Sequence, residues 1–148
     1  MTPESLFRLA STIVLPGWLL LVFAPSWKWT TRFIAGFLIP VLLGLLYLYI
    51  MLVHWRGAEG GFGSLDQVSD LFRNPWLLLA GWVHYLAFDL FIGAWEVRDA
   101  RREGIHHLLV IPCLFLTFMF GPVGLLLYFG LRAGIRKRLM ISEETTRA

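Results

Sequence analysis

The sequence contains few charged residues. Asp, Glu, Lys and Arg together make up 16% of its 148 residues, whereas soluble domains contain about 25%. Hydrophobic residues make up 57%, and the mean hydropathy is +0.68. This composition argues against a soluble globular domain, a disordered chain and a nucleic-acid-binding module. It predicts a small polytopic membrane protein, in which apolar side chains face lipid as well as each other.

Cysteine and the common catalytic motifs are also scarce. Cys113 is the only cysteine, so neither an intrachain disulfide nor a cysteine zinc site is expected. The sequence holds no nucleotide-binding loop, zinc motif or nucleophile elbow, and we predict no metal site. The net charge is +3, and the Lys and Arg residues stand at the ends of apolar runs, as membrane-flanking anchors do.

Four long apolar segments make up most of the chain. Their runs are continuous and rich in leucine, which favours helices over the alternating strands of a membrane β-barrel. We predict an all-α fold with four transmembrane helices in a bundle. The spans of this single domain lie at about 6–24, 33–53, 75–95 and 107–131, followed by a basic polar tail over 132–148. Pro112 and Gly121-Pro122 should bend the fourth span.

The connecting segments carry weaker signals. Apolar residues recur at helical spacing over residues 64–72, which predicts a short amphipathic helix at the interface between spans two and three. Residues 96–103 follow the third span and look like a tight charged loop. With four spans, eight Lys and Arg residues lie on the side of the two termini and five on the other. We therefore expect both termini in the cytoplasm.

The third predicted span carries the polar residues of interest. Asp89 is the only acidic residue inside a predicted span, and a charge at that depth costs about 2.5–3.5 kcal/mol. Helical spacing places Asp89 on one stripe with Trp82, one turn after Tyr85. His84, close to the middle of the span, lies on another stripe with Phe88. His84 and Asp89 are about 140° apart around the helix, so we expect them to flank one cavity without bonding directly.

A carboxyl group and an imidazole in an apolar site suit proton transfer. The alternative interpretation is structural. Asp89 and His84 would then only bind a neighbouring helix, Trp82 and Tyr85 would only pack, and the charged residues after Trp95 would form a solvated loop. Both interpretations remain open from the residues alone.

The polar residues of the third span also match a known family. Between Gly61 and Leu126, the most specific part is a core of Trp82-x-His84-Tyr85-x-x-x-Asp89 followed by Arg98-Asp99. In this half of the chain the sequence resembles the family of the plant abscisic acid-deficient-type membrane proteins, the neoxanthin synthase family. The first two spans resemble that family only in being apolar.

The resemblance implies a four-span protein with a role in xanthophyll metabolism. Conversion of violaxanthin to neoxanthin is an isomerisation that opens an epoxide, removes a proton from a polyene carbon and forms an allene. It needs an acid and a base but no redox cofactor. We hypothesise catalytic roles for His84, Asp89 and Tyr85. The hypothesis assigns substrate binding to Trp82, Phe88, Trp95, Arg98 and Asp99.

The chain departs from the plant family in two ways. With so few residues before the first span we expect no plastid transit peptide, and Arg outnumbers Lys eleven to two. Both indicate a bacterial inner-membrane protein, whose substrate could be another carotenoid, a retinoid or a related isoprenoid. The expected partners are the lipid bilayer and such a polyene or isoprenoid ligand, without nucleic acid, and homo-oligomerisation is left open. The alternatives are a non-catalytic carotenoid-binding or scaffold protein, and a small transporter or proton relay.

Overall fold

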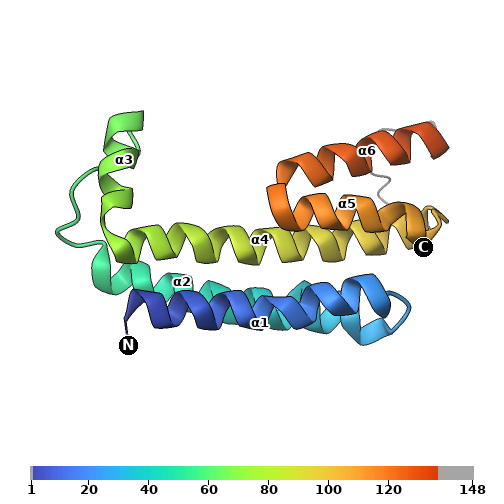
Figure 1. The fold of residues 1–148 in the computed structure, drawn as a ribbon, viewed down its shortest axis with the longest axis horizontal. Coiled ribbons are helices and arrows are strands. Elements are labelled where there is room, and N and C mark those ends of the chain that lie inside the picture. Colours follow the sequence, from blue (N-terminus) through green and yellow to red (C-terminus); the bar gives the residue numbers. More distant parts are fainter. Residues whose placement is uncertain (1, 137–148) are drawn as a thin grey trace, which may run out of the picture.

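A computed structural model describes residues 2–136 of the chain. These residues form helices and no strand, which confirms the all-α prediction. The elements are α1 (Pro3–Phe23), the π-helical segment η1 (Thr30–Leu38), α2 (Ile39–His54), α3 (Leu65–Arg73), α4 (Pro75–Arg102), α5 (His107–Phe120) and α6 (Pro122–Arg136). Helix α4 contacts every other element and forms the centre of the structure (Figure 1).

Three helical segments are long and apolar enough to cross a membrane. They are Pro3–Phe23, the continuous η1–α2 segment Thr30–His54, and Pro75–Arg102, with 21, 25 and 28 residues. They correspond to the first three predicted spans. Small residues let α1 approach α4 closely, because a Cβ added at Gly93 would lie 2.7 Å from the Trp18 ring. Such small-residue contacts are typical of helix pairs in membranes.

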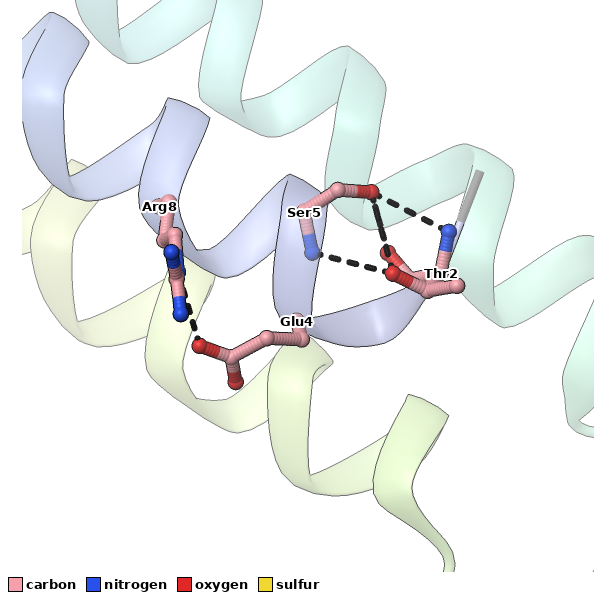
Figure 2. A network of polar contacts seen from close by, with 4 residues as sticks. All are labelled: Thr2, Glu4, Ser5 and Arg8. Atoms are coloured by element: carbon pink, nitrogen blue, oxygen red, sulfur yellow. Dashed lines mark hydrogen bonds and ion pairs between the residues drawn. The ribbon is translucent and has the colours of Figure 1, made fainter.

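Hydrogen bonds at the start of α1 fix its first turn. The Thr2 hydroxyl accepts from the Ser5 backbone N–H at 3.2 Å, and the Ser5 hydroxyl accepts from the Thr2 N–H at 3.1 Å. This reciprocal pair is a capping box. One turn further along, Glu4 and Arg8 form an ion pair of 2.9 Å on the exposed face (Figure 2).

The predicted short helix between spans two and three is α3. The Ser64 hydroxyl accepts from the Gln67 N–H at 3.3 Å and caps its start. Leu71 is 3% exposed and Leu65 is 84% exposed, so only part of the apolar stripe packs against the rest of the structure. Asn74 ends α3, and its side-chain oxygen accepts from the Trp76 N–H at 2.9 Å to cap α4.

The charged loop predicted after Trp95 is wrong, because α4 continues through this segment to Arg102. Glu96 and Asp99, at 0% and 4% exposure, are buried rather than solvated. The helix continues because both carboxylates find partners on the helices that follow. The Thr117 hydroxyl donates to Glu96 at 2.9 Å, and the Tyr128 hydroxyl donates to Asp99 at 2.7 Å.

The segment expected to form one bent span is instead a hairpin of two helices. Helix α5 runs back along α4 and ends beside its middle, and α6 then returns toward the end of α4 (Figure 1). Gly121, with φ +49°, forms the turn. With 14 and 15 residues, the two helices are about 21 and 22 Å long at 1.5 Å per residue. Each is shorter than the hydrocarbon core of about 30 Å, and four spans are therefore not confirmed.

The hairpin places the start of α1 and the described end of α6 at opposite ends of the molecule. Arg132, near the end of α6, binds Glu103 at the end of α4 at 3.1 Å. Helix α1 begins at the other end, where Phe7 contacts Trp82 with ring centroids 5.3 Å apart. The prediction of both termini in the cytoplasm depends on a fourth crossing, and it stays a prediction because four spans are not confirmed. Residues 137–148, the rest of the predicted basic tail, lie outside the described part of the chain.

Helices α5 and α6 approach each other so closely that Gly124 has no room for a side chain, which can be tested by substitution. A Cβ at Gly124 would lie 2.1 Å from both the backbone nitrogen and the hydroxyl of Thr117. Because backbone must move, we expect Gly124→Ala to destabilise the protein by at least about 2 kcal/mol. Thermal unfolding in detergent, followed by tryptophan fluorescence, measures the effect.

Gly130 provides the matched control on the same helix. A Cβ at this position would meet no atom within 4 Å, so Gly130→Ala should gain up to about 1 kcal/mol from helix propensity. Equal unfolding temperatures for the two variants would contradict the hairpin packing.

Candidate functional site

An apolar groove of about 650 Å³ lies between α1, α3 and the first half of α4. Its walls are mainly apolar and aromatic, with Phe7 from α1, Phe72 from α3, and Leu78, Trp82 and Tyr85 from α4. Glu4 lines the groove as well, and its ion pair with Arg8 is drawn in Figure 2. The groove is of the size that holds small hydrophobic ligands.

Hydrogen bonds hold the two aromatic side chains of α4 in place. The Trp82 indole N–H donates to the Ser11 hydroxyl of α1 at 3.0 Å. The Tyr85 hydroxyl donates to the backbone carbonyl of Phe118 in α5 at 2.7 Å. The two rings also contact each other, with centroids 5.3 Å apart. Tyr85 therefore joins the groove to the α5–α6 hairpin.

Asp89 lies one helical turn beyond Tyr85, about 6 Å along the axis, and faces the hairpin turn. A Cβ added at Gly121 would lie 2.9 Å from Oδ1 of Asp89, so the carboxyl group lies directly against this turn. Helix α6 begins at the next residue, and the positive end of its dipole favours a negative charge there. Among the described residues, Oδ2 of Asp89 is buried without a hydrogen-bond partner.

A buried carboxyl oxygen without a partner is costly, and a catalytic role is one explanation for such a group. Asp89 does not line the groove itself, whose lining on α4 ends at Tyr85. The arrangement thus offers an apolar groove, a phenol at its inner end and a carboxyl group one turn deeper. These are the groups that acid–base chemistry on an apolar molecule requires.

His84 faces a different part of the structure. Its ring stacks on Phe88 with centroids 4.5 Å apart and approaches Tyr47 of α2 at 5.9 Å. It lines a second cavity of about 230 Å³ together with Tyr47 and Trp55, and Asp89 is not part of that lining. The structure therefore does not bring His84 and Asp89 to one cavity.

The residues hypothesised to bind substrate also lie in different parts of the structure. Trp82 lines the groove, whereas Trp95 packs against Tyr128 of α6 with ring centroids 5.5 Å apart. Phe88 is 58% exposed on the side of His84. Arg98 donates to the Thr31 carbonyl of η1. Asp99 binds α6 through Tyr128.

A buried polar cluster that was not predicted from the sequence lies between α4 and the hairpin. Arg132 is 1% exposed. It binds Asp99 at 2.9 Å and Glu103 at 3.1 Å. Tyr128 donates to the same Asp99 oxygen. Tyr128 and Arg132 are one turn apart on a helix, and this spacing was the available sequence signal. Their partners Asp99 and Glu103 were not recognised because residues 96–103 were expected to form a loop.

Histidine, cysteine and acidic side chains do not gather into a metal site in the part of the chain that the structure describes. No group of three such residues within residues 2–136 could hold an ion. Of the adjacent pair His106 and His107, the ring of His107 instead contacts the Val22 carbonyl at 3.0 Å.

The fold and the groove together define a small helical membrane protein with an apolar groove and a carboxyl group halfway along its central helix. A family model described as ABA DEFICIENT 4-like matches residues 5–128. The chain belongs to this ABA4-like family. The matched range includes the groove, Asp89 and the Gly121 turn.

A curated relative agrees with this assignment. The chain is 25% identical over 144 residues to a protein named Protein ABA DEFICIENT 4, chloroplastic, from Arabidopsis thaliana. The alignment covers 91% of this chain and 64% of the Arabidopsis protein. No solved structure matches the chain.

Proposed function

We propose that this protein is an integral membrane isomerase acting on a carotenoid, a retinoid or a related isoprenoid by acid–base chemistry without a redox cofactor. One observation carries the proposal: the inner end of an apolar groove meets Tyr85, and Asp89 follows one turn deeper with a buried oxygen that lacks a partner among the described residues. Membership of the ABA4-like family supports it.

The groove suits a ligand that arrives from the bilayer. Its apolar walls would bury the end group of a polyene, and the flat rings of Phe7, Phe72 and Trp82 suit contact with a conjugated chain. The rest of the polyene would extend along α4 among the lipid tails. A bacterial inner membrane, which the arginine-rich composition favours, is the proposed location.

The proposed reaction moves protons without changing the composition of the substrate. Tyr85 donates its hydroxyl proton to an epoxide oxygen, and the carbon–oxygen bond breaks. Asp89 accepts the proton that leaves the polyene carbon, whose electron pair forms the new double bond. Transfer of that proton from Asp89 to Tyr85 restores both groups. His84, which faces the second cavity, is proposed to pack the α2–α4 interface.

A panel of candidate substrates tests the proposal. Purified protein incubated with epoxy-carotenoids, other carotenoids and retinoids should yield a product of unchanged mass and altered chromatographic retention. Failure with the whole panel, by protein with a cooperative unfolding transition, would contradict an isomerase. Binding of a polyene in the groove without conversion would favour the non-catalytic carotenoid-binding alternative.

A further inference from the structure

A third cavity, distant from the groove, lies at the opposite end of α4. It has a volume of about 400 Å³ and is lined by Lys28, Thr31, Arg32, Arg98, Arg101 and Arg102. Five of these six residues carry a positive charge, and none of the lining residues within the described part of the chain is a carboxylate. Lys28 precedes η1 and two of the residues belong to it, while three come from the last turns of α4. We call this cavity the basic pocket.

Two of the arginines are held in position by backbone carbonyls. Arg98 donates to the carbonyl of Thr31, and Arg101 donates to the carbonyl of Pro25 at 3.0 Å. The Arg98 guanidinium also lies 5.9 Å from the centroid of the Phe91 ring. A guanidinium has five N–H donors, so a bond to one carbonyl leaves a fork that can bind a further acceptor.

The carboxylates in the same turns of α4 have a cationic partner outside the basic pocket. Asp99 and Glu103 both bind Arg132 of α6. The positive charges of Lys28, Arg32 and Arg98 repel one another in the pocket, and an anion with several oxygens would relieve that repulsion. Arginine forks match the geometry of phosphate in particular.

The basic pocket lies where lipid headgroups are expected. Trp27 and Trp29 stand beside Lys28 in the chain, and each is 49% exposed, as is typical of tryptophans at a membrane interface. The hairpin adds Arg132 to this end of the molecule. The start of α1, the end of α2 and α3 lie at the other end (Figure 1), and the arginines in or next to these parts of the sequence are Arg8, Arg56 and Arg73. The excess of arginine and lysine assigns the basic pocket to the cytosolic face, where the leaflet is anionic.

We propose that the basic pocket binds the phosphate group of an anionic lipid. Guanidinium forks from two segments would surround the phosphate oxygens, and the acyl chains would run along η1 and the end of α4. The site is independent of the isomerase proposal, since it lies at the far end of α4 from the groove.

Measurements of lipid-dependent stability, together with native mass spectrometry, test whether the basic pocket binds an anionic lipid. Detergent-solubilised protein receives phosphatidylglycerol, phosphatidylcholine or inorganic phosphate, and thermal unfolding and bound lipid are recorded. Phosphatidylglycerol should raise the unfolding temperature, and phosphatidylcholine should not. The double variant Lys28→Gln/Arg32→Gln should weaken phosphatidylglycerol binding at least 10-fold, a change of about 1.4 kcal/mol.

The matched control removes two positive charges at the other end of the molecule. Arg56→Gln/Arg73→Gln carries the same net charge as the pocket variant and should bind phosphatidylglycerol like the wild type. An equal loss of phosphatidylglycerol affinity in both variants would show general charge attraction and would overturn the proposal that the lipid binds in the basic pocket. An equal shift with inorganic phosphate would overturn a lipid as the source of the phosphate.

Discussion

Replacing Asp89 with asparagine is expected to lower the rate of substrate conversion by about 10²–10⁴-fold, the range that a positioned acid or base contributes. Asparagine keeps the shape of the side chain beside Gly121 but cannot accept the proton from the polyene carbon. Substrate binding should change little, because the groove lining does not include Asp89. Initial rates and ligand affinity measured on the same preparation separate the two effects.

His84→Ala is the informative comparison for Asp89→Asn. The sequence assigned both residues to catalysis, but His84 lies beside Tyr47 and Phe88. We therefore expect His84→Ala to convert substrate within about 10-fold of the wild type, well short of the loss of a positioned acid or base. If His84→Ala lowers the rate of conversion as much as Asp89→Asn does, the proposal that only the Asp89 face of α4 is catalytic is contradicted.

Replacing Arg132 with methionine is expected to cost about 3–5 kcal/mol of stability, the range for breaking a buried ion pair. Arg132 is 1% exposed and binds Asp99, which is 4% exposed. Methionine would leave the Asp99 carboxylate buried without its positive partner. Chemical or thermal unfolding in detergent measures the loss, and adding Asp99→Asn should recover part of it.

Arg73→Met is the control for Arg132→Met. Arg73 pairs with Asp70 at 3.0 Å, but its side chain is 79% exposed, and exposed pairs contribute at most about 1 kcal/mol. If the two methionine variants unfold at the same temperature, the buried cluster between α4 and α6 does not stabilise the hairpin.

The sequence predicted the parts of the fold that depend on long apolar runs. The first three spans and the amphipathic helix α3 follow from hydropathy and helical spacing, and the structure has helices at all four places. The hairpin could not be predicted in the same way. Gly121-Pro122 indicates a bend, but a kinked span and a reversal at Gly121 produce the same hydropathy profile over residues 107–131.

The candidate site was predicted in part for a related reason. Spacing on one helix placed Tyr85 and Asp89 on one side of α4, and Tyr85 does line the groove. Spacing does not say which helix each face of α4 meets. His84 meets α2, and Asp89 meets the Gly121 turn more than thirty residues away. Glu96 and Asp99 looked solvated because their partners Thr117 and Arg132 lie on later helices.

Isotopic labelling gives the most direct test of the central claim that the groove and Asp89 carry out an isomerisation. The protein is incubated with an epoxy-carotenoid that carries deuterium at the polyene carbon that loses its proton. The mass of the product is then measured by mass spectrometry. We expect a product one mass unit lighter than the labelled substrate, formed by the wild type and not by Asp89→Asn. Retention of the deuterium in the product, or equal conversion by Asp89→Asn, would contradict it.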